Sequence, residues 1–228
     1  MAAAPAATKP VVRYFAIRGK GEPIRVALTD LGVDFENHVV DFAAWPKIKA
    51  EGIADGSLPF TQLPAYADED GKFGQMNAIL RHIGRKHGAC GATEAEMTQV
   101  DMFLEAVEDV RQAYLKLVYT EGCEEGKCAE FAATHTDASA RNGGKIAHLN
   151  NAAARLGGKF IAGTTEATVA DYSAFCLFDD LLRVCPAVLE SQPWLAAWLE
   201  TMRARPRIAA YVTAGHEYRT RVNGNGKG

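Results

Sequence analysis

The periodicity of hydrophobic residues changes at Gly88–Gly91, and this change limits the possible folds more than any other feature of the chain. Before it, short runs of β-branched and aromatic residues alternate with helical patterns. After it, apolar residues recur at helical spacing almost throughout, starting from Thr93 and Glu96, which are spaced as a capping box. We therefore predict an α+β protein of two domains, a mixed domain over residues 9–88 and an all-helical domain over residues 92–228.

The first domain is predicted to run strand, helix, strand, short helix, strand, strand, helix. The corresponding spans are Val11–Phe15, Ile24–Leu31, Phe35–Val40, a piece opened by Trp45, Leu63–Ala67, Lys72–Gly74 and a helix entered through Gln75. Pro64 lies at the start of a strand. If its peptide bond is cis, the backbone of Leu63 faces outward and could pair with a peptide-like ligand.

The loop Ala16–Gly21 joins the end of the first strand to the start of the first helix. Open α/β sheets bind ligands at such junctions, and a helix N-terminus attracts anionic groups. Tyr14 at the edge of this loop could offer its hydroxyl to a ligand, although from this stretch alone a tyrosine packed in the core is the simpler interpretation. Trp45 and Lys49 lie in the long connector after the second strand, where ligand contacts are common, although each alone is as well explained as a half-buried indole or a surface lysine.

The second domain is predicted to be a bundle with one buried central helix. That helix is the apolar run Tyr172–Leu182, preceded by a second capping pattern at Thr168 and Asp171. The other predicted helices are Thr93–Leu117, Cys128–Ala140, Ile146–Leu156, Trp194–Met202 and Arg207–Val212. The tail Val222–Lys227 has no periodicity and is expected to lie on the surface or fold back.

Composition excludes several classes of function. A net charge of −3 and a pI near 6.1 provide no general attraction to nucleic acid or to an anionic membrane surface. No apolar run reaches the length of a membrane span. The five cysteines contain no Cys-x-x-Cys pair, so we expect reduced thiols, a cytoplasmic protein and no metal centre.

Other motifs that could carry chemistry are incomplete. The pair Gly19 and Gly21 suggests a nucleotide loop, but the dinucleotide fingerprint requires a small residue where Ile24 stands, and no P-loop lysine motif follows. The histidines occur singly, without the spacing of metal ligands. Asp179 and Asp180 are adjacent on a helix and therefore diverge, so we expect them to be solvated rather than paired for catalysis.

Several remaining motifs occur together in an order that resembles one family. They are Tyr14-Phe15, Gln62-Leu63-Pro64, Gln75 to Arg85, Val107-Glu108-Asp109, Ala170-Asp171-Tyr172, Ala204-Arg205-Pro206 and Asn223 to Lys227. With them the chain resembles the cytosolic glutathione transferases nearly end to end. The likeness is greatest to the pi class, while the connector is similar to that of the mu and sigma classes.

This resemblance implies a thioredoxin-like first domain that binds glutathione, a helical second domain that lines the electrophile pocket, and a cytoplasmic homodimer with a role in detoxification. It makes Tyr14 the catalytic residue, whose hydroxyl donates to the sulfur of glutathione. The glutathione-binding residues that it implies are Tyr14, Lys20, Trp45, Lys49, Gln62, Leu63, Gln75, Met76 and, across the dimer interface, Asp109. The implied electrophile pocket consists of Phe15, Ile17, Phe42, Leu115 and Tyr119, and the implied interface residues are Phe60 and Arg81.

Two of these positions depart from the family pattern. Lys20 replaces an arginine, and Met76 replaces a serine whose hydroxyl binds the γ-glutamyl carboxylate, so we expect weaker glutathione binding. The activity implied is conjugation of the glutathione thiolate to hydrophobic electrophiles, by addition or aromatic substitution, with glutathione as co-substrate and no metal. The alternatives are glutathione-dependent isomerisation of lipid endoperoxides and a ligand-binding or regulatory protein of low activity.

Overall fold

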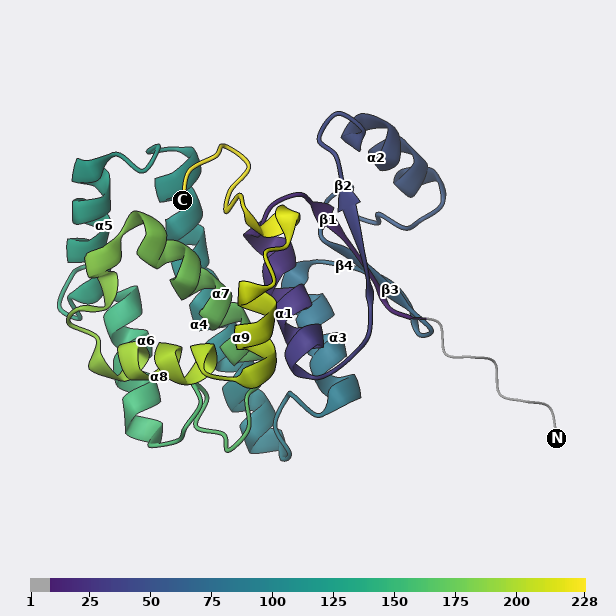
Figure 1. Ribbon diagram of the computed structural model, residues 1–228. Coiled ribbons are helices and arrows are strands. Elements are labelled where there is room, and N and C mark those ends of the chain that lie inside the picture. Colours follow the sequence, from purple (N-terminus) through teal and green to yellow (C-terminus); the bar gives the residue numbers. More distant parts are fainter. Residues whose placement is uncertain (1–8) are drawn as a thin grey trace.

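A four-stranded sheet and three helices form the first part of the chain in the computed structural model, which describes residues 9–228 apart from the side chain of Glu125 (Figure 1). The strand order is β2-β1-β3-β4, with β1 parallel to β2 and antiparallel to β3, which is antiparallel to β4. The predicted order of elements and the antiparallel hairpin are confirmed. The bounds are β1 Val11–Phe15, α1 Glu22–Asp30, β2 Glu36–Val40, α2 Trp45–Ala54, β3 Ala65–Asp68, β4 Gly71–Gly74 and α3 Met76–His87, with a 3₁₀ turn at Gly19–Gly21.

Helices α1 and α3 lie between the sheet and the helical domain, whereas α2 lies on the far side of the sheet (Figure 1). Strand β1 alternates between partly exposed and buried residues, so Val12 and Tyr14 face the same covered side. Asp30 at the end of α1 joins the two parts of the chain, because its carboxylate accepts from the Tyr172 hydroxyl at 2.9 Å and from Arg205 at 2.7 Å. The end of α1 is therefore held against the helical domain.

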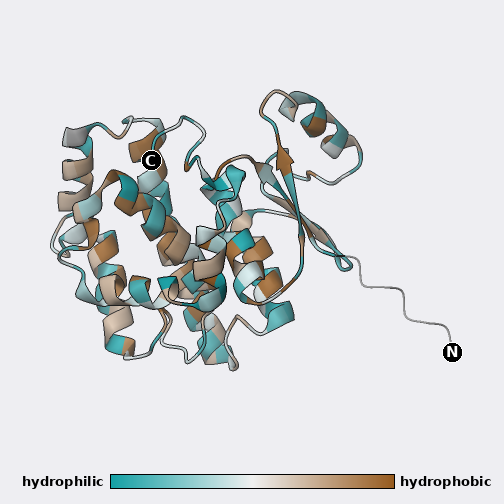
Figure 2. Ribbon diagram, in the orientation of Figure 1, coloured by the Kyte–Doolittle hydropathy of each residue, from teal (hydrophilic) through white to brown (hydrophobic). Residues whose placement is uncertain are grey.

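The second part of the chain is helical, and hydrophilic and hydrophobic stretches alternate along most of its helices, as expected of amphipathic elements (Figure 2). The prediction for the fifth helix was too long. That helix ends at Thr136, because Asp137 turns extended and its carboxylate accepts the N–H of Ser139 at 2.8 Å. The bounds are α4 Glu94–Tyr119, α5 Glu125–Thr136, α6 Lys145–Leu156, α7 Val169–Val184, α8 Pro193–Arg203 and α9 Pro206–Thr213, with short 3₁₀ turns at Pro186–Leu189 (η2) and Glu217–Arg219.

Helix α7 is the buried centre of this domain, as predicted, and Asp171 fixes its N-terminus. The Asp171 carboxylate accepts from the N–H and hydroxyl of Thr168, from the N–H of Ile161 and from the indole N–H of Trp198, all at 2.8–2.9 Å. The capping pattern therefore does more than close one helix, because it also holds the chain before α7 and the helix α8 in place.

We expect Asp171→Ala to lower the free energy of unfolding by about 3 kcal/mol or more, because it leaves several buried donors without acceptors. Thr93→Ala is the matched control. It removes the cap of the exposed box on α4 and should cost about 1 kcal/mol. Urea denaturation measures both. Equal losses for the two variants would contradict the wider role of Asp171.

The tail folds back onto the body of the protein. The N–H groups of Arg18 and Gly19 donate to the carbonyls of Arg221 and Val222 at 2.9 and 3.1 Å. The side chain of Asn223 is buried and donates to the Tyr114 hydroxyl at 2.7 Å. The tail thus bridges the loop after β1 and the helix α4.

Candidate active site

The two glycines of the loop after β1 allow the backbone to pass close to the Tyr14 ring. A Cβ at Gly21 would lie 2.5 Å from the Tyr14 ring, and one at Gly19 would lie 2.7 Å from the hydroxyl oxygen. Gly19 also has a φ of +39°, which disfavours residues with a side chain. The glycines that suggest a phosphate loop from sequence therefore serve to close the loop over a tyrosine.

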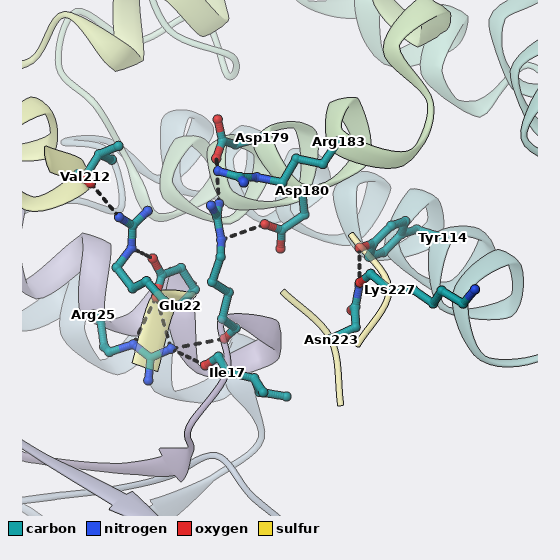
Figure 3. A network of polar contacts seen from close by, with 12 residues as sticks. Ile17, Glu22, Arg25, Tyr114, Asp179, Asp180, Arg183, Val212, Asn223 and Lys227 are labelled. Atoms are coloured by element: carbon teal, nitrogen blue, oxygen red, sulfur yellow. Dashed lines mark hydrogen bonds and ion pairs between the residues drawn. The ribbon is translucent and has the colours of Figure 1, made fainter. Parts of the chain in front are cut away.

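Arg25 on α1 braces this loop from below. Its buried guanidinium donates to the carbonyls of Ile17 at 2.7 Å and Arg18 at 3.1 Å, and it pairs with Glu22 at 3.0 Å (Figure 3). The backbone that surrounds Tyr14 is thus held by a buried, hydrogen-bonded charge rather than left mobile.

The Tyr14 hydroxyl is oriented so that it can donate. The side chain is 8% exposed, and its oxygen accepts the N–H of Lys20 at 2.9 Å. Within residues 9–228 no acceptor engages the hydroxyl proton. Burial raises the pKa of Tyr14, with the N–H of Lys20 opposing the rise, so the hydroxyl is protonated at neutral pH. A protonated hydroxyl with one lone pair already satisfied is suited to donate to an anion.

A cavity beside the start of α3 brings together most of the residues implied for glutathione. Its lining includes Lys20, Phe60, Gln62, Leu63, Gln75 and Met76. The Leu63–Pro64 peptide is cis, which is the condition under which the Leu63 backbone is expected to face outward. Gln75, which precedes α3 with a φ of +67°, and Met76, the first residue of α3, both line the cavity. The unpaired N–H groups at the N-terminus of this helix therefore lie beside the cavity.

The two departures from the family pattern occupy defined positions here. The Lys20 ammonium lies 3.2 Å from the carboxylate of Glu108 on α4, so this cation is already paired. Met76 is 4% exposed and its side chain belongs to the hydrophobic core. At Met76, only the backbone and the helix terminus are available to an anionic group.

Four of the implied residues are not in the lining of this cavity, and one of them is Tyr14, whose position under the loop is described above. Trp45 and Lys49 are one turn apart on α2, and the Trp45 ring meets the Phe15 ring edge-on at 5.4 Å. Asp109 is exposed on α4, in a groove between α4 and α6. Within one chain Asp109 is not among the residues that line the cavity, and its role across a dimer interface stays a prediction.

An aromatic surface adjoins the loop. The Phe15 and Phe42 rings are stacked, with their centroids 4.5 Å apart and an interplanar angle of 5°. Ile17, two residues after Phe15, is buried. Tyr119 at the end of α4 accepts the N–H of Gly224 at 3.0 Å. Gly224 also lies against Phe42, because a Cβ there would be 3.8 Å from that ring. The fifth residue implied for this pocket, Leu115, is partly buried on α4.

Asp179 and Asp180 are not solvated, which corrects the prediction from sequence. Asp180 is 3% exposed and pairs with the Arg18 guanidinium at 2.7 Å, and Asp179 pairs with the same guanidinium at 2.7 Å (Figure 3). The two carboxylates do diverge on α7, but Arg18 from the first domain inserts between them. Burial raises the pKa of Asp180 to about 7, against the opposing effect of Arg18.

The implied interface residues lie at the surface and on α3. Phe60 is 60% exposed although it is a large aromatic side chain. Arg81 on α3 pairs within the chain with Asp101 at 2.8 Å and with Glu105, both on α4. An apolar groove between α4 and α6 is lined by Met102, Phe103, Ala106, Leu149 and Ala152, with Gln99, Asp109, Lys145 and His148 at its margins.

Side chains that could ligate a metal gather at one place in the described residues. Ligand atoms of Asp68, Asp70 and His82 lie within 4.8 Å of one another. The Lys86 ammonium already contacts Asp68 at 3.2 Å and Asp70 at 2.7 Å, so a cation of the chain occupies this position. In the same part of the chain, none of the helices combines the length and apolar composition needed to cross a membrane.

The contacts of four residues near the site are not predicted from sequence, namely those of Glu108, Tyr114, Asn223 and Gly224. The Glu108 carboxylate pairs with Lys20, the Tyr114 hydroxyl accepts from the Asn223 side chain, and the N–H of Gly224 donates to the Tyr119 hydroxyl. Two features of the sequence could have pointed to these contacts. Glu108 is next to Asp109, and the alternating Asn-Gly pattern of the tail is typical of turns rather than of an extended terminus. Neither signal says which distant residue is the partner.

The thioredoxin-like sheet has a cis-proline directly before β3 and is followed by an all-helical domain. Models of the N-terminal and C-terminal domains of glutathione S-transferases match residues 10–85 and 108–215. The chain belongs to the glutathione S-transferase family, and it is an enzyme of the transferase type.

Relatives match over nearly the whole chain. "Glutathione S-transferase P" of Caenorhabditis elegans is 34% identical over 214 residues, covering 94% of this chain and 97% of the relative. "Glutathione S-transferase P 1" of Xenopus laevis is 33% identical over 204 residues, covering 89% and 91%. The structure of the Pi-class glutathione S-transferase of Onchocerca volvulus superposes with a TM-score of 0.83 at 30% identity, covering 97% of this chain and 100% of the other.

Proposed function

We propose that the protein joins the glutathione thiolate to hydrophobic electrophiles and that Tyr14 stabilises the thiolate by donating its hydroxyl hydrogen bond. The observation that carries this proposal is the Lys20 N–H bond to the Tyr14 oxygen, which leaves the hydroxyl proton free to donate. A thiol of pKa near 8.5 is mostly protonated at neutral pH. A hydrogen bond that stabilises the thiolate form lowers this pKa and so raises the fraction of glutathione present as the reactive thiolate.

Glutathione is proposed to lie in the cavity at the start of α3. Its cysteinyl part pairs with the backbone of Leu63, which forms no main-chain hydrogen bond within residues 9–228. Its γ-glutamyl carboxylate approaches the N-terminus of α3 between Gln75 and Met76, with Gln62 nearby. The glycyl carboxylate extends toward Trp45 and Lys49, and Asp109 of a second copy reaches the γ-glutamyl amine.

The electrophile is proposed to bind on the aromatic surface of Phe15, Phe42 and Tyr119. The stacked rings of Phe15 and Phe42 form a flat apolar surface. Phe42 is 44% exposed, so a hydrophobic ligand could cover its ring and remove that apolar area from water. The sulfur would emerge from Tyr14 at the inner edge of this surface.

One assay separates the proposal from its alternatives. The protein should be retained on immobilised glutathione and should turn over a chromogenic aryl halide. Retention without turnover of that halide would favour a ligand carrier, and a new ring product from a lipid endoperoxide, exceeding aryl halide turnover, would favour the isomerase. Failure of both retention and turnover would contradict the proposal.

Met76→Ser should tighten glutathione binding about 2- to 10-fold, because a hydroxyl at the start of α3 adds one hydrogen bond to an anionic group. Isothermal titration with glutathione measures the dissociation constant. Met76→Ala is the matched control, since it loses the same core packing without adding a donor. If Met76→Ser bound glutathione no more tightly than Met76→Ala, the missing hydroxyl would not explain weak binding.

Phe60 is proposed to insert into the groove between α4 and α6 of a second copy. An exposed aromatic side chain and an apolar groove on the same chain are the two halves of an isologous interface. Phe60→Ala should weaken dimerisation about 30- to 150-fold, the effect of losing an anchor worth 2 to 3 kcal/mol.

Sedimentation equilibrium measures this weakening. Phe42→Ala is the control, because Phe42 is also an exposed aromatic residue but faces the loop after β1. An unchanged dimer in Phe60→Ala, or equal weakening in Phe42→Ala, would count against the assignment of Phe60.

A further inference from the structure

Three cysteines from separate elements come together at one end of the helical domain. Cys123 lies in the loop between α4 and α5, Cys128 is in the first turns of α5, and Cys185 caps the C-terminal end of α7. The Cys185 sulfur lies 3.6 Å from the carbonyl oxygen of Cys128, and α5 packs on η2, which begins directly after Cys185. The neighbours of Cys123 include Cys128 and Lys227.

The thiols of Cys128 and Cys185 differ in access. Cys185 is 3% exposed, whereas Cys128 is partly exposed on a helix at the surface. All three cysteines are reduced in the structure. None of them takes part in the site around Tyr14, so the glutathione chemistry does not account for this cluster.

We propose that Cys128 and Cys185 are a disulfide-forming pair that joins α5 to the end of α7. The Cys185 sulfur lies 3.6 Å from the Cys128 carbonyl oxygen, and the Cys128 side chain is itself a direct neighbour of the Cys185 thiol, so both thiols lie at the same contact between α5 and the end of α7. Cys128 is the entry thiol because reagents reach it, and Cys185 is the resolving thiol.

The oxidant is a small-molecule disulfide. The Cys128 thiolate attacks one sulfur of the reagent, which forms a mixed disulfide and releases one thiolate. Cys185 then loses its proton to solvent and attacks the Cys128 sulfur, which releases the second thiolate. Two cysteine thiols and one reagent disulfide thus become one protein disulfide and two reagent thiols, with no other redox partner.

The second step is expected to depend steeply on pH. Burial, together with the neighbouring Cys128, raises the pKa of Cys185 to about 12. Well below that pKa the thiolate fraction grows about tenfold for each pH unit, and so does the rate at which the mixed disulfide closes. Among the described side chains, Lys227 is a charged neighbour of Cys123.

The test treats the full-length protein with hydroxyethyl disulfide, followed by alkylation, non-reducing peptide mapping and mass measurement. We expect a Cys128–Cys185 link without bound reagent, closing about tenfold faster per pH unit from pH 7 to 9. Because the link closes a long loop, since the two residues are 57 positions apart in the sequence, the thermal midpoint should rise by roughly 5–10 °C.

Two variants make the result specific. Cys128→Ser should abolish the link and the thermal shift. Cys90→Ser should leave both intact, because the Cys90 sulfur also lies 3.6 Å from a carbonyl, that of Arg81, but its neighbours are Arg85 and Asp101 and not a second thiol. A mixed disulfide that persists on Cys128, or a link between Cys123 and Cys128, would overturn the proposal.

Discussion

Replacing Tyr14 by phenylalanine should lower kcat/KM for conjugation at neutral pH about 10- to 100-fold and move the pH dependence upward by about one to two units. A hydrogen bond to a charged acceptor contributes about 1.5–3 kcal/mol, and each unit of thiol pKa corresponds to about 1.4 kcal/mol. The phenylalanine ring still fits beneath Gly19 and Gly21, so the change removes the donor and keeps the shape.

The measurement is kcat/KM for a chromogenic aryl halide as a function of pH, with the ultraviolet absorbance of bound thiolate as a second readout. Tyr66→Phe is the matched control, because it removes a hydroxyl from a buried tyrosine of the same sheet that bonds to Asp68. A Tyr14→Phe enzyme with full activity and an unchanged pH profile would falsify the proposed role of the hydroxyl.

Replacing Arg18 by methionine should lower the free energy of unfolding by about 3–5 kcal/mol, because it leaves a buried carboxylate without its partner. Asp179 keeps ion pairs to Arg203 at 3.0 Å and Arg183 at 3.6 Å, so Asp180 bears most of the loss. Urea denaturation measures the change. Arg183→Met is the matched control and should cost less than about 1 kcal/mol, since that side chain is half exposed.

The loss caused by Arg18→Met should grow with pH. The folded protein binds a proton at Asp180 more tightly than the unfolded chain, because burial raises the pKa of this carboxyl to about 7. Such a group lowers stability as pH rises from its unfolded pKa near 4 to its folded pKa. Without Arg18 the folded pKa rises further, so the deficit should be larger at pH 8 than at pH 5.

Arg18→Met combined with Asp180→Asn should recover part of the loss and most of its pH dependence. The double variant also serves if Arg18→Met alone fails to fold. A deficit that is independent of pH, or that the second substitution does not relieve, would show that the buried pair is not its cause.

The features that sequence predicts best here are local ones. The hairpin of β3 and β4, the capping box at Thr93 and the central helix α7 follow from turn residues, cap spacing and periodicity within short windows. The end of α5 was missed because Asp137 caps a turn with Ser139, a signal that competes with a continuing helical pattern. Local signals thus predict which helices and strands form, but they predict the residues at which these elements end less well.

The features that sequence does not predict depend on distant partners. Asp179 and Asp180 look like surface acids until Arg18, far away in the chain, is placed between them. Lys20 looks like a free cation until Glu108 is found beside it. The proposal that Tyr14 is the catalytic residue came from resemblance, because a tyrosine at the end of a strand has no local feature that distinguishes a hydrogen-bond donor from a packed ring.

The backbone bonds that join Arg18 and Gly19 to Arg221 and Val222 have a consequence for the order of folding. They connect positions near opposite ends of the described chain and close a very long loop within residues 9–228. Because closing a longer loop costs more conformational entropy, these contacts are expected to form late in refolding. Secondary structure and the helical core can assemble before them. The proposed binding of an electrophile should therefore appear late in refolding, after most helical signal has returned, and its half-time reports the joining of the two domains.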